Sequence, residues 1–282
     1  MTTEAVPAYG PSALGGGIRR FVELTLTLAH SEFKLRYFGS VLGYVWSLMR
    51  PLLFFGVLYL FFTEILHIGK GIPHYGTYLL TGIVLWNYFG EATGNSVSCL
   101  VTREGLLRKM RFPRMVIPLS VSLTATFNLA MNAIAVFVFA IADGVVPKAS
   151  WLELLPIAFG FIVFATGIGM LLSALFVRYR DVAPIWEVLS QAWFYCSPIM
   201  YTASSYGERF GPGFAHIAML NPIAVLLTQM GHALIGGPKF PTAATITGGY
   251  GTVIIAMALI PAVFALGWWF FTHEAPLVAE NL

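Results

Sequence analysis

Charged side chains are scarce in this chain of 282 residues. Only 10% of the residues are Asp, Glu, Lys or Arg, whereas 57% are hydrophobic and 15% are aromatic. With a mean hydropathy of +0.77, this composition excludes a water-soluble globular domain of the same length. It is typical of a membrane protein, in which each helix needs about 20 apolar residues to cross a bilayer core about 30 Å thick.

Motifs for catalysis and nucleotide binding are also lacking. Gly69-Lys70-Gly71 is not a phosphate-binding loop, because it lacks the earlier glycine and the Ser or Thr after the lysine. The six histidines do not have metal-ligand spacing, and no nucleophile–base pair is evident. We therefore predict a transport subunit rather than an enzyme, with no cofactor in this chain. If transport is energised, the motor is another chain.

Cysteine is nearly absent, with two residues in the chain. Cys99 is expected near the inner end of one apolar segment and Cys196 toward the outer end of another. Opposite depths argue against a disulfide, so the sequence predicts two buried free thiols.

What the chain does contain is a series of long apolar segments. The predicted fold class is an all-α polytopic membrane protein: an N-terminal amphipathic interfacial helix, six transmembrane helices, and short re-entrant or interfacial helices between spans five and six. Prolines interrupt residues 210–238, which favours two short helices there over a seventh span. The transmembrane domain is predicted over residues 19–273, with the interfacial helix at 19–37, spans at about 41–63, 75–99, 116–142, 154–177, 184–203 and 250–272, a flexible cytoplasmic tail at 1–18 and a second cytoplasmic tail at 274–282.

A basic island, Arg103–Arg114, carries five of the sixteen Lys and Arg residues. With the N-terminus inside and six spans, twelve of the sixteen fall on the inner side, and Lys- and Arg-rich loops stay cytoplasmic. The sequence thus predicts a multi-pass protein of the cytoplasmic (inner) membrane with both termini in the cytoplasm. Residues 102–112 are predicted to form a short amphipathic helix that ends before Pro113. Its basic side either only anchors the topology or docks a partner.

Three stretches in colinear order resemble a known family over roughly residues 19–272. They resemble the permease subunit of bacterial ABC exporters that move lipid-linked polysaccharides such as O-antigen, teichoic acid, capsule or cell-wall galactan. The stretches are Phe33–Trp46 followed by Pro51; the island ending Phe112-Pro113-Arg114, with Pro118; and Arg178–Val182, followed by Gln191, Phe194-Tyr195, Ser197-Pro198-Ile199, Tyr201 and Asn221-Pro222.

The resemblance implies a homodimer of permeases with two copies of a nucleotide-binding ATPase subunit, which holds the ATP and Mg. It implies a pore between the permeases, lined largely by spans one and five, and a coupling helix docked on the ATPase. For Arg178–Asp181, a tight inner turn alone is the alternative. The predicted ATPase-coupling residues are Arg103, Leu106, Leu107, Arg108, Lys109, Met110, Arg111, Arg178, Arg180 and Asp181.

The function expected from this resemblance is ATP-driven export of a lipid-diphosphate-linked polysaccharide, a step of lipopolysaccharide or cell-wall biogenesis. The expected partners are the ATPase subunit, a second copy of the chain, the lipid-linked polysaccharide and the membrane, but no nucleic acid. Two rivals remain: a proton-coupled transporter with Glu91 as the proton carrier, and a membrane-embedded glycosyltransferase, which would need carboxylates or a metal site at a membrane face.

Aromatic side chains crowd spans one and five. Aromatic rings stack on the apolar faces of sugars and would let a polymer slide. For any single ring, a membrane-interface belt or core packing is the alternative. The predicted substrate path comprises Tyr44, Trp46, Phe54, Tyr59, Trp186, Trp193, Phe194, Tyr195 and Tyr201.

Two charges interrupt the apolar spans, where an ionised group usually faces a cavity or a partner. Glu91 shares one helix face with Asn87 and Asn95 at i−4 and i+4, which favours a hydrogen-bonded cluster between helices. Arg50 either snorkels to the inner surface or, with Lys34 and Arg36, binds the lipid diphosphate.

Overall fold

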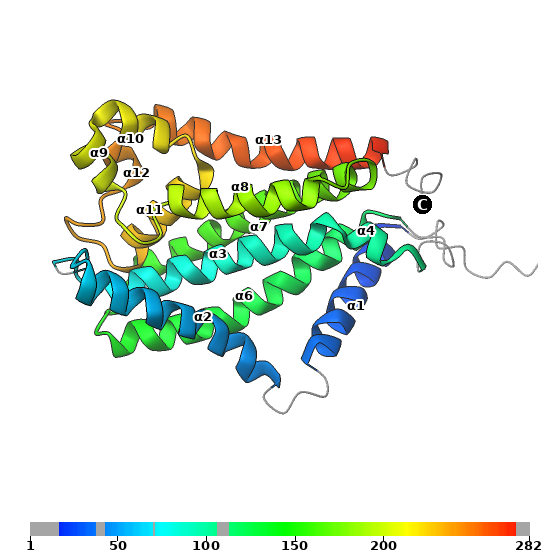
Figure 1. The fold of residues 1–282 in the computed structure, drawn as a ribbon, viewed down its shortest axis with the longest axis horizontal. Coiled ribbons are helices and arrows are strands. Elements are labelled where there is room, and N and C mark those ends of the chain that lie inside the picture. The colour runs from blue at the N-terminus through cyan, green and yellow to red at the C-terminus, as the bar shows by residue number, and fades with distance from the viewer. Residues whose placement is uncertain (1–16, 38–42, 70, 106–112, 275–282) are drawn as a thin grey trace, which may run out of the picture.

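The computed structural model describes residues 17–37, 43–69, 71–105 and 113–274, and every regular element in them is helical. The helices form an elongated bundle (Figure 1), which confirms the all-α fold class. The long helices are α1 (Ile18–Tyr37), α2 (Gly43–Leu60), α3 (Tyr75–Val97), α6 (Val116–Ala142), α7 (Leu154–Arg178), α8 (Val182–Cys196) and α13 (Gly251–Glu274); the short elements are η1 (Phe61–Ile65, a π turn), α4 (Cys99–Thr102), η2 (Ala149–Glu153, a 3-10 turn), α9 (Ser204–Phe210), α10 (Pro212–Ala218), α11 (Pro222–Leu234) and α12 (Ala243–Ile246).

Helix α3 lies at the centre of the bundle and packs against α2, α6, α7 and α8. Its first eleven residues are all buried. Polar side chains in a membrane-protein bundle face its interior rather than lipid, and central α3 accordingly carries Thr, Asn and Glu side chains. This burial brings the polar face of α3 against its neighbours.

Helices α7 and α13 approach each other backbone to backbone. A Cβ atom added at Gly167 would lie 2.6 Å from the Cα of Phe264, and one at Gly267 would overlap the carbonyl of Gly167. In a membrane, where lipid is as apolar as the helix surface, small residues allow the close packing that holds helices together. The two glycines therefore fix α13 against the bundle.

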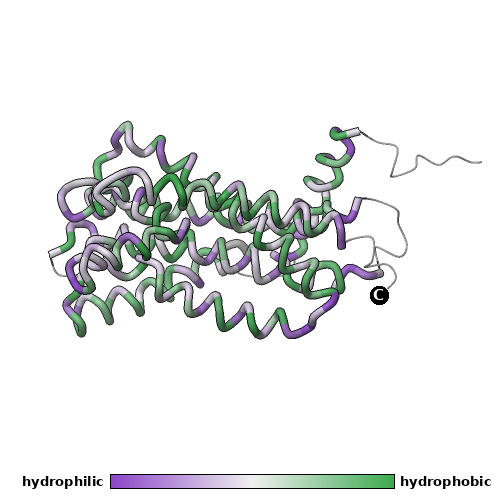
Figure 2. Tube along the Cα trace, turned by 90° about the horizontal axis from the view of Figure 1, so that it is seen from above, coloured by the Kyte–Doolittle hydropathy of each residue, from purple (hydrophilic) through white to green (hydrophobic). Residues whose placement is uncertain are grey.

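Among the residues that the structure describes, four helical segments are long and apolar enough to cross a membrane, and a fifth is counted if the bent pair α10 and α11 forms one span. They correspond to predicted spans one, three, four and six. Hydrophobic residues, drawn in green, occur along the whole length of the bundle (Figure 2). Helix α3 matches predicted span two in position, but its polar face lowers its hydropathy. Helix α8 has 15 residues and ends at Cys196, before Ser197-Pro198, rather than at residue 203. The count of six spans stays a prediction.

The segment between α8 and α13 forms short helices, as the prolines indicated. Helices α10 and α11 meet at an angle of 103°. Asn221 caps α11 by accepting a hydrogen bond from the backbone N–H of Ile223 at 3.0 Å, and Pro222 occupies the first turn. Helix α11 is then buried along nearly its whole length.

The two ends of the bundle differ. The basic end holds α4, the Arg178–Asp181 turn, the start of α1 and the end of α13, while the cap end holds α9, α10 and α12 (Figure 1). Both cysteines are free. Cys99 is buried as predicted, but the prediction was wrong for Cys196, which is exposed because it ends α8 at the cap end.

Candidate functional site

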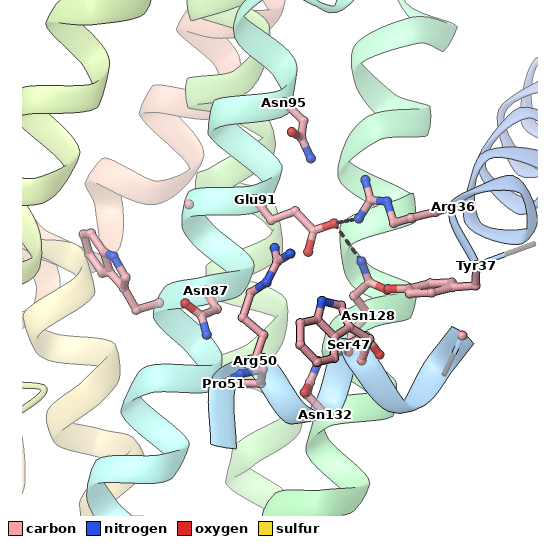
Figure 3. Close-up of a pocket in the computed structure, with 14 residues that line it drawn as sticks. Arg36, Tyr37, Ser47, Arg50, Pro51, Asn87, Glu91, Asn95, Asn128 and Asn132 are labelled. Atoms are coloured by element: carbon pink, nitrogen blue, oxygen red, sulfur yellow. Dashed lines mark hydrogen bonds and ion pairs between the residues drawn. The ribbon is translucent and has the colours of Figure 1, made fainter. Parts of the chain in front are cut away.

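A cavity of about 600 Å³ opens between α1, α2, α3 and α6. Figure 3 shows the labelled polar side chains of these four helices converging on it. Four of the six asparagines in the chain line this cavity, two from α3 and two from α6. The lining residues are Arg36, Tyr37, Gly43, Trp46, Ser47, Arg50, Pro51, Trp86, Asn87, Gly90, Glu91, Asn95, Asn128 and Asn132.

Glu91 is the centre of a hydrogen-bonded cluster on one wall of the cavity. Its Oε1 pairs with the Arg36 guanidinium and accepts a hydrogen bond from Asn128 Nδ2 at 2.7 Å. The Tyr37 hydroxyl donates to Asn128 Oδ1 at 2.7 Å, so three helices meet here. Burial lowers the pKa of Arg36, but the Glu91 carboxylate more than offsets this and holds that pKa above its ordinary value. The predicted interhelical cluster is confirmed, with partners on α1 and α6 rather than on α3.

Other polar groups in the cavity are left open. Within the described ranges, the side chains of Arg50, Asn87 and Asn95 have no hydrogen-bond or ion-pair partner, and all three are exposed to the cavity or solvent. The Arg50 side chain reaches up beside α3 to the level of Glu91 (Figure 3). Lys34, the third residue predicted for the lipid diphosphate, is exposed on α1 and does not line the cavity. The structure thus brings Arg36 and Arg50 together and leaves Lys34 outside.

A second ion pair attaches α1 to the basic end. Arg103, in the turn after α4, pairs with Glu32 and also donates to the Ile117 carbonyl and Ser120 Oγ, both at 3.3 Å. Glu32 is the one acid on the otherwise apolar side of α1, and Arg103 is its partner. Burial raises the pKa of the Glu32 carboxyl above its ordinary value, and the Arg103 charge offsets part of that rise. Helix α1 is therefore held at two points along the bundle.

The remaining residues predicted for ATPase coupling lie at the same end. Arg178, the last residue of α7, is exposed, as are Arg180 and Asp181 in the tight turn before α8. The Arg180 guanidinium lies 5.0 Å from the centre of the Phe176 ring. In the predicted coupling helix, α4 ends at Thr102 and Arg103 lies in a turn. Leu106, Leu107, Arg108, Lys109, Met110 and Arg111 lie outside the described residues.

The sequence of this chain is similar to those of known proteins. Residues 23–233 match the model of the family described as ABC-2 type transporter. The chain belongs to this family. An O-antigen export system permease protein RfbA from Klebsiella pneumoniae is 30% identical over 216 residues, which cover 76% of this chain and 81% of that protein. The RfbA permease of Myxococcus xanthus is 30% identical over 208 residues, covering 73% and 78% of the two chains. The chain is therefore a membrane-spanning subunit of a transporter.

In this ABC-2 transporter subunit, the aromatic side chains of the predicted path divide into two groups. Trp193 packs at 5.5 Å from the Phe89 ring, Phe194 is buried, and the Trp186 Nε1 donates to Thr93 Oγ1 at 3.2 Å. These rings belong to the packing between α8 and α3. Tyr201 is half-buried, with its hydroxyl bonded to the Tyr195 carbonyl. The exposed rings are those of Trp46, Phe54, Tyr59 and Tyr195; the side chain of Tyr44 lies outside the described part of the chain.

Sequence reasoning missed the two asparagines that α6 contributes to the cavity, Asn128 and Asn132. Both lie in the apolar segment 116–142, four residues apart on one face of α6. Two amides on one face of a membrane-spanning helix are a signal of a polar partner or a cavity, in the same way as an intramembrane charge. Only the fold shows that this face meets the Asn87–Asn95 face of α3.

Proposed function

We propose that this chain is the membrane-spanning subunit of an ATP-driven exporter that moves a polysaccharide carried on a polyprenyl diphosphate across the cytoplasmic membrane. Two copies enclose the path, the basic end faces the cytoplasm, and a separate ATPase subunit binds there. The relatives' names, which specify O-antigen export, support a polysaccharide substrate.

The observation that carries the proposal is Arg50, which has no ion-pair partner among the described residues and lines a cavity that already holds Arg36. With Glu91 included, the charged side chains lining the cavity sum to one positive charge. A diphosphate ester is anionic where its lipid tail meets its sugar. A guanidinium in partly dehydrated surroundings binds phosphate oxygens through two parallel hydrogen bonds, which lysine does not reproduce. Arg50 is placed to make these bonds, with Arg36 beside it.

Transport needs a link between this cavity and the ATPase. In the proposal, the basic island and the Arg178–Asp181 turn dock on the ATPase, and Arg103 transmits movement of the island to α1 through Glu32. Because Arg36 lies in the last turn of α1, a displacement of α1 would change the position of Arg36 in the cavity. ATP hydrolysis would then alter the site that holds the substrate.

Substitution of Arg50 tests the substrate assignment. We expect Arg50→Ala to abolish stimulation of ATPase activity by lipid-linked polysaccharide, and Arg50→Lys to reduce it about tenfold, the effect of about 1.4 kcal/mol. Basal ATPase activity and insertion should survive. Arg209→Ala, which removes an exposed arginine at the cap end, is the matched control. Normal stimulation of Arg50→Ala would show that Arg50 only snorkels.

Substitution of the island tests the partner. Replacing Leu106, Leu107 and Met110 together with Asp should abolish co-purification of the ATPase while leaving the permease in the membrane. In vesicles of the wild-type complex, export should require ATP and should not be driven by a pH gradient alone. Retention of the ATPase by the triple variant would contradict the coupling-helix assignment.

The exposed rings test the sugar path. Tyr195 is 66% exposed, so Tyr195→Ala should slow export severalfold while leaving the thermal stability unchanged. Trp193→Ala should instead lower stability, since Trp193 packs against Phe89 and Phe164. Equal export rates for wild type, Tyr195→Ala and a paired variant of Trp46 and Phe54 would assign these rings to lipid contact.

A further inference from the structure

The amide side chains of the cavity form a row along the bundle. On α3, Asn95, Glu91 and Asn87 follow one another at intervals of four residues, so the row spans about 12 Å at a rise of about 1.5 Å per residue. On the facing side, Asn128 and Asn132 are separated by one such interval on α6. Figure 3 shows Asn95, Glu91 and Asn87 along one ribbon and Asn128 and Asn132 along another, with the cavity between them.

Hydrogen bonding separates these groups into a structural set and an open set. In the structural set, Asn128 donates a hydrogen bond to Glu91, Glu91 pairs with Arg36, and the Tyr37 hydroxyl donates to Asn128. Asn132 donates to the Asn128 carbonyl at 2.8 Å, which leaves its amide oxygen open. As noted for the described residues, Asn87 and Asn95 have no partner. Polar groups at membrane depth are costly unless they meet a partner or water, so these open amides face either water or another occupant of the cavity.

The chemistry of the open set defines that occupant. Each amide offers both donors and an acceptor without a charge, which matches hydroxyl groups, since these also donate and accept. A site for an anion alone would need only hydrogen-bond donors, and Arg50 already provides these. The Trp46 ring, 50% exposed, lines the same cavity and offers an apolar face to the C–H side of a sugar ring. The volume of about 600 Å³ lies within the range of sites that enclose small ligands.

We propose that Asn87, Asn95 and Asn132 form a carbohydrate subsite that binds the sugar residues attached directly to the diphosphate. The inference rests on the proposed function, in which Arg50 binds that diphosphate. Because the amides are spaced along the bundle rather than gathered at one point, the subsite fits an extended chain of hydroxylated rings. It recognises the reducing end of the polymer by its hydroxyls.

Binding of two lipids to the purified permease–ATPase complex in nanodiscs tests the subsite, with tryptophan fluorescence as the readout. The probes are undecaprenyl diphosphate and undecaprenyl diphosphate carrying one N-acetylglucosamine. Wild type should bind the sugar-bearing lipid more tightly. Asn87→Leu and Asn95→Leu should each weaken its binding about threefold to tenfold, the effect of one lost hydrogen bond, without changing the binding of the bare lipid. Asn95→Gln, which keeps an amide, should retain part of the preference.

Gln229→Leu is the matched control, because it removes an amide that is bonded to Glu153 outside the cavity. Equal weakening of both lipids in the Asn87 and Asn95 variants, or no weakening of either, would overturn the carbohydrate subsite and leave the diphosphate site standing. If wild type bound neither lipid while the ATPase remained attached, the lipid-diphosphate substrate itself would be wrong, and the subsite with it. If both lipids bound equally to wild type, the amide side chains would not recognise the sugar.

Discussion

The two ends of this bundle are held by different kinds of contact. At the basic end, α1 is attached through the ion pairs Glu32–Arg103 and Arg36–Glu91. At the cap end, neutral donors bind backbone carbonyls that follow helix ends: Tyr75 donates to the Met200 carbonyl at 2.7 Å, and Tyr78 donates to those of Pro198 and Tyr201.

The difference bears on which end can rearrange. The contacts of the cap end join neutral groups, so a charged ligand competes for them less strongly than for an ion pair. A guanidinium paired with a carboxylate will also bind a phosphate, and a partner's charge competes with either member of the pair. The end proposed to meet the ATPase and the lipid diphosphate is therefore the one whose attachments can be replaced.

The largest effect is expected at the cap end. Tyr78 is 2% exposed and packs 5.1 Å from the Phe240 ring. Tyr78→Ala should lower the free energy of unfolding by about 3 to 5 kcal/mol, as for other large buried rings. Tyr78→Phe, which keeps the ring but leaves two carbonyls without this donor, should cost about 1 to 2 kcal/mol. Thermal unfolding in detergent measures both, and an unchanged melting temperature for Tyr78→Ala would contradict a rigid cap end.

Charge reversal at the basic end should have a smaller and more local effect. Arg103→Glu places two acids together and should destabilise the attachment of α1 by about 1 to 3 kcal/mol, since both side chains remain partly exposed. Hydrogen exchange should rise in residues 18–37 and not in α11. Combining it with Glu32→Arg should restore protection. Failure of the double variant to recover would show that the pair does not act as a unit.

A change in salt concentration should affect the stability of the two ends differently, by a still smaller amount. Raising the ionic strength from about 0.1 M to about 1 M shortens the Debye length from about 10 Å to about 3 Å. The opening free energy of α1 measured by hydrogen exchange should fall by less than about 1 kcal/mol, whereas that of α11 should not change. Equal salt sensitivity of the two helices would remove the distinction between their attachments.

The smallest effect is expected for the surface pair Arg19–Glu23, whose side chains are 92% and 60% exposed. Glu23→Ala should change stability by no more than about 0.5 kcal/mol, because exposed pairs of this spacing contribute little. It is the control for charge removal from α1. A larger loss of α1 protection from Glu23→Ala than from Arg103→Glu would mean that helix charge, not the two ion pairs, holds α1.

Much of the fold was predictable because its signals are local. The apolar runs gave the long helices closely, with 116–142 matched at both ends by α6. The face shared by Asn87, Glu91 and Asn95 indicated an interhelical cluster. Its partners were not predictable, because Arg36 and Asn128 are separated from Glu91 by 55 and 37 residues, and one sequence carries no record of which faces meet.

Composition, helical periodicity and the distribution of Lys and Arg by themselves determined that this chain is an all-helical membrane protein with an amphipathic first helix. These properties follow from the cost of placing charge and unpaired backbone in lipid, which each segment obeys independently of the others. Only the tertiary structure decided that Glu32 meets Arg103, that Trp193 packs inward while Tyr195 does not, and that four asparagines face one cavity. Such contacts depend on the relative rotation and depth of helices distant in sequence, which packing of the whole bundle sets.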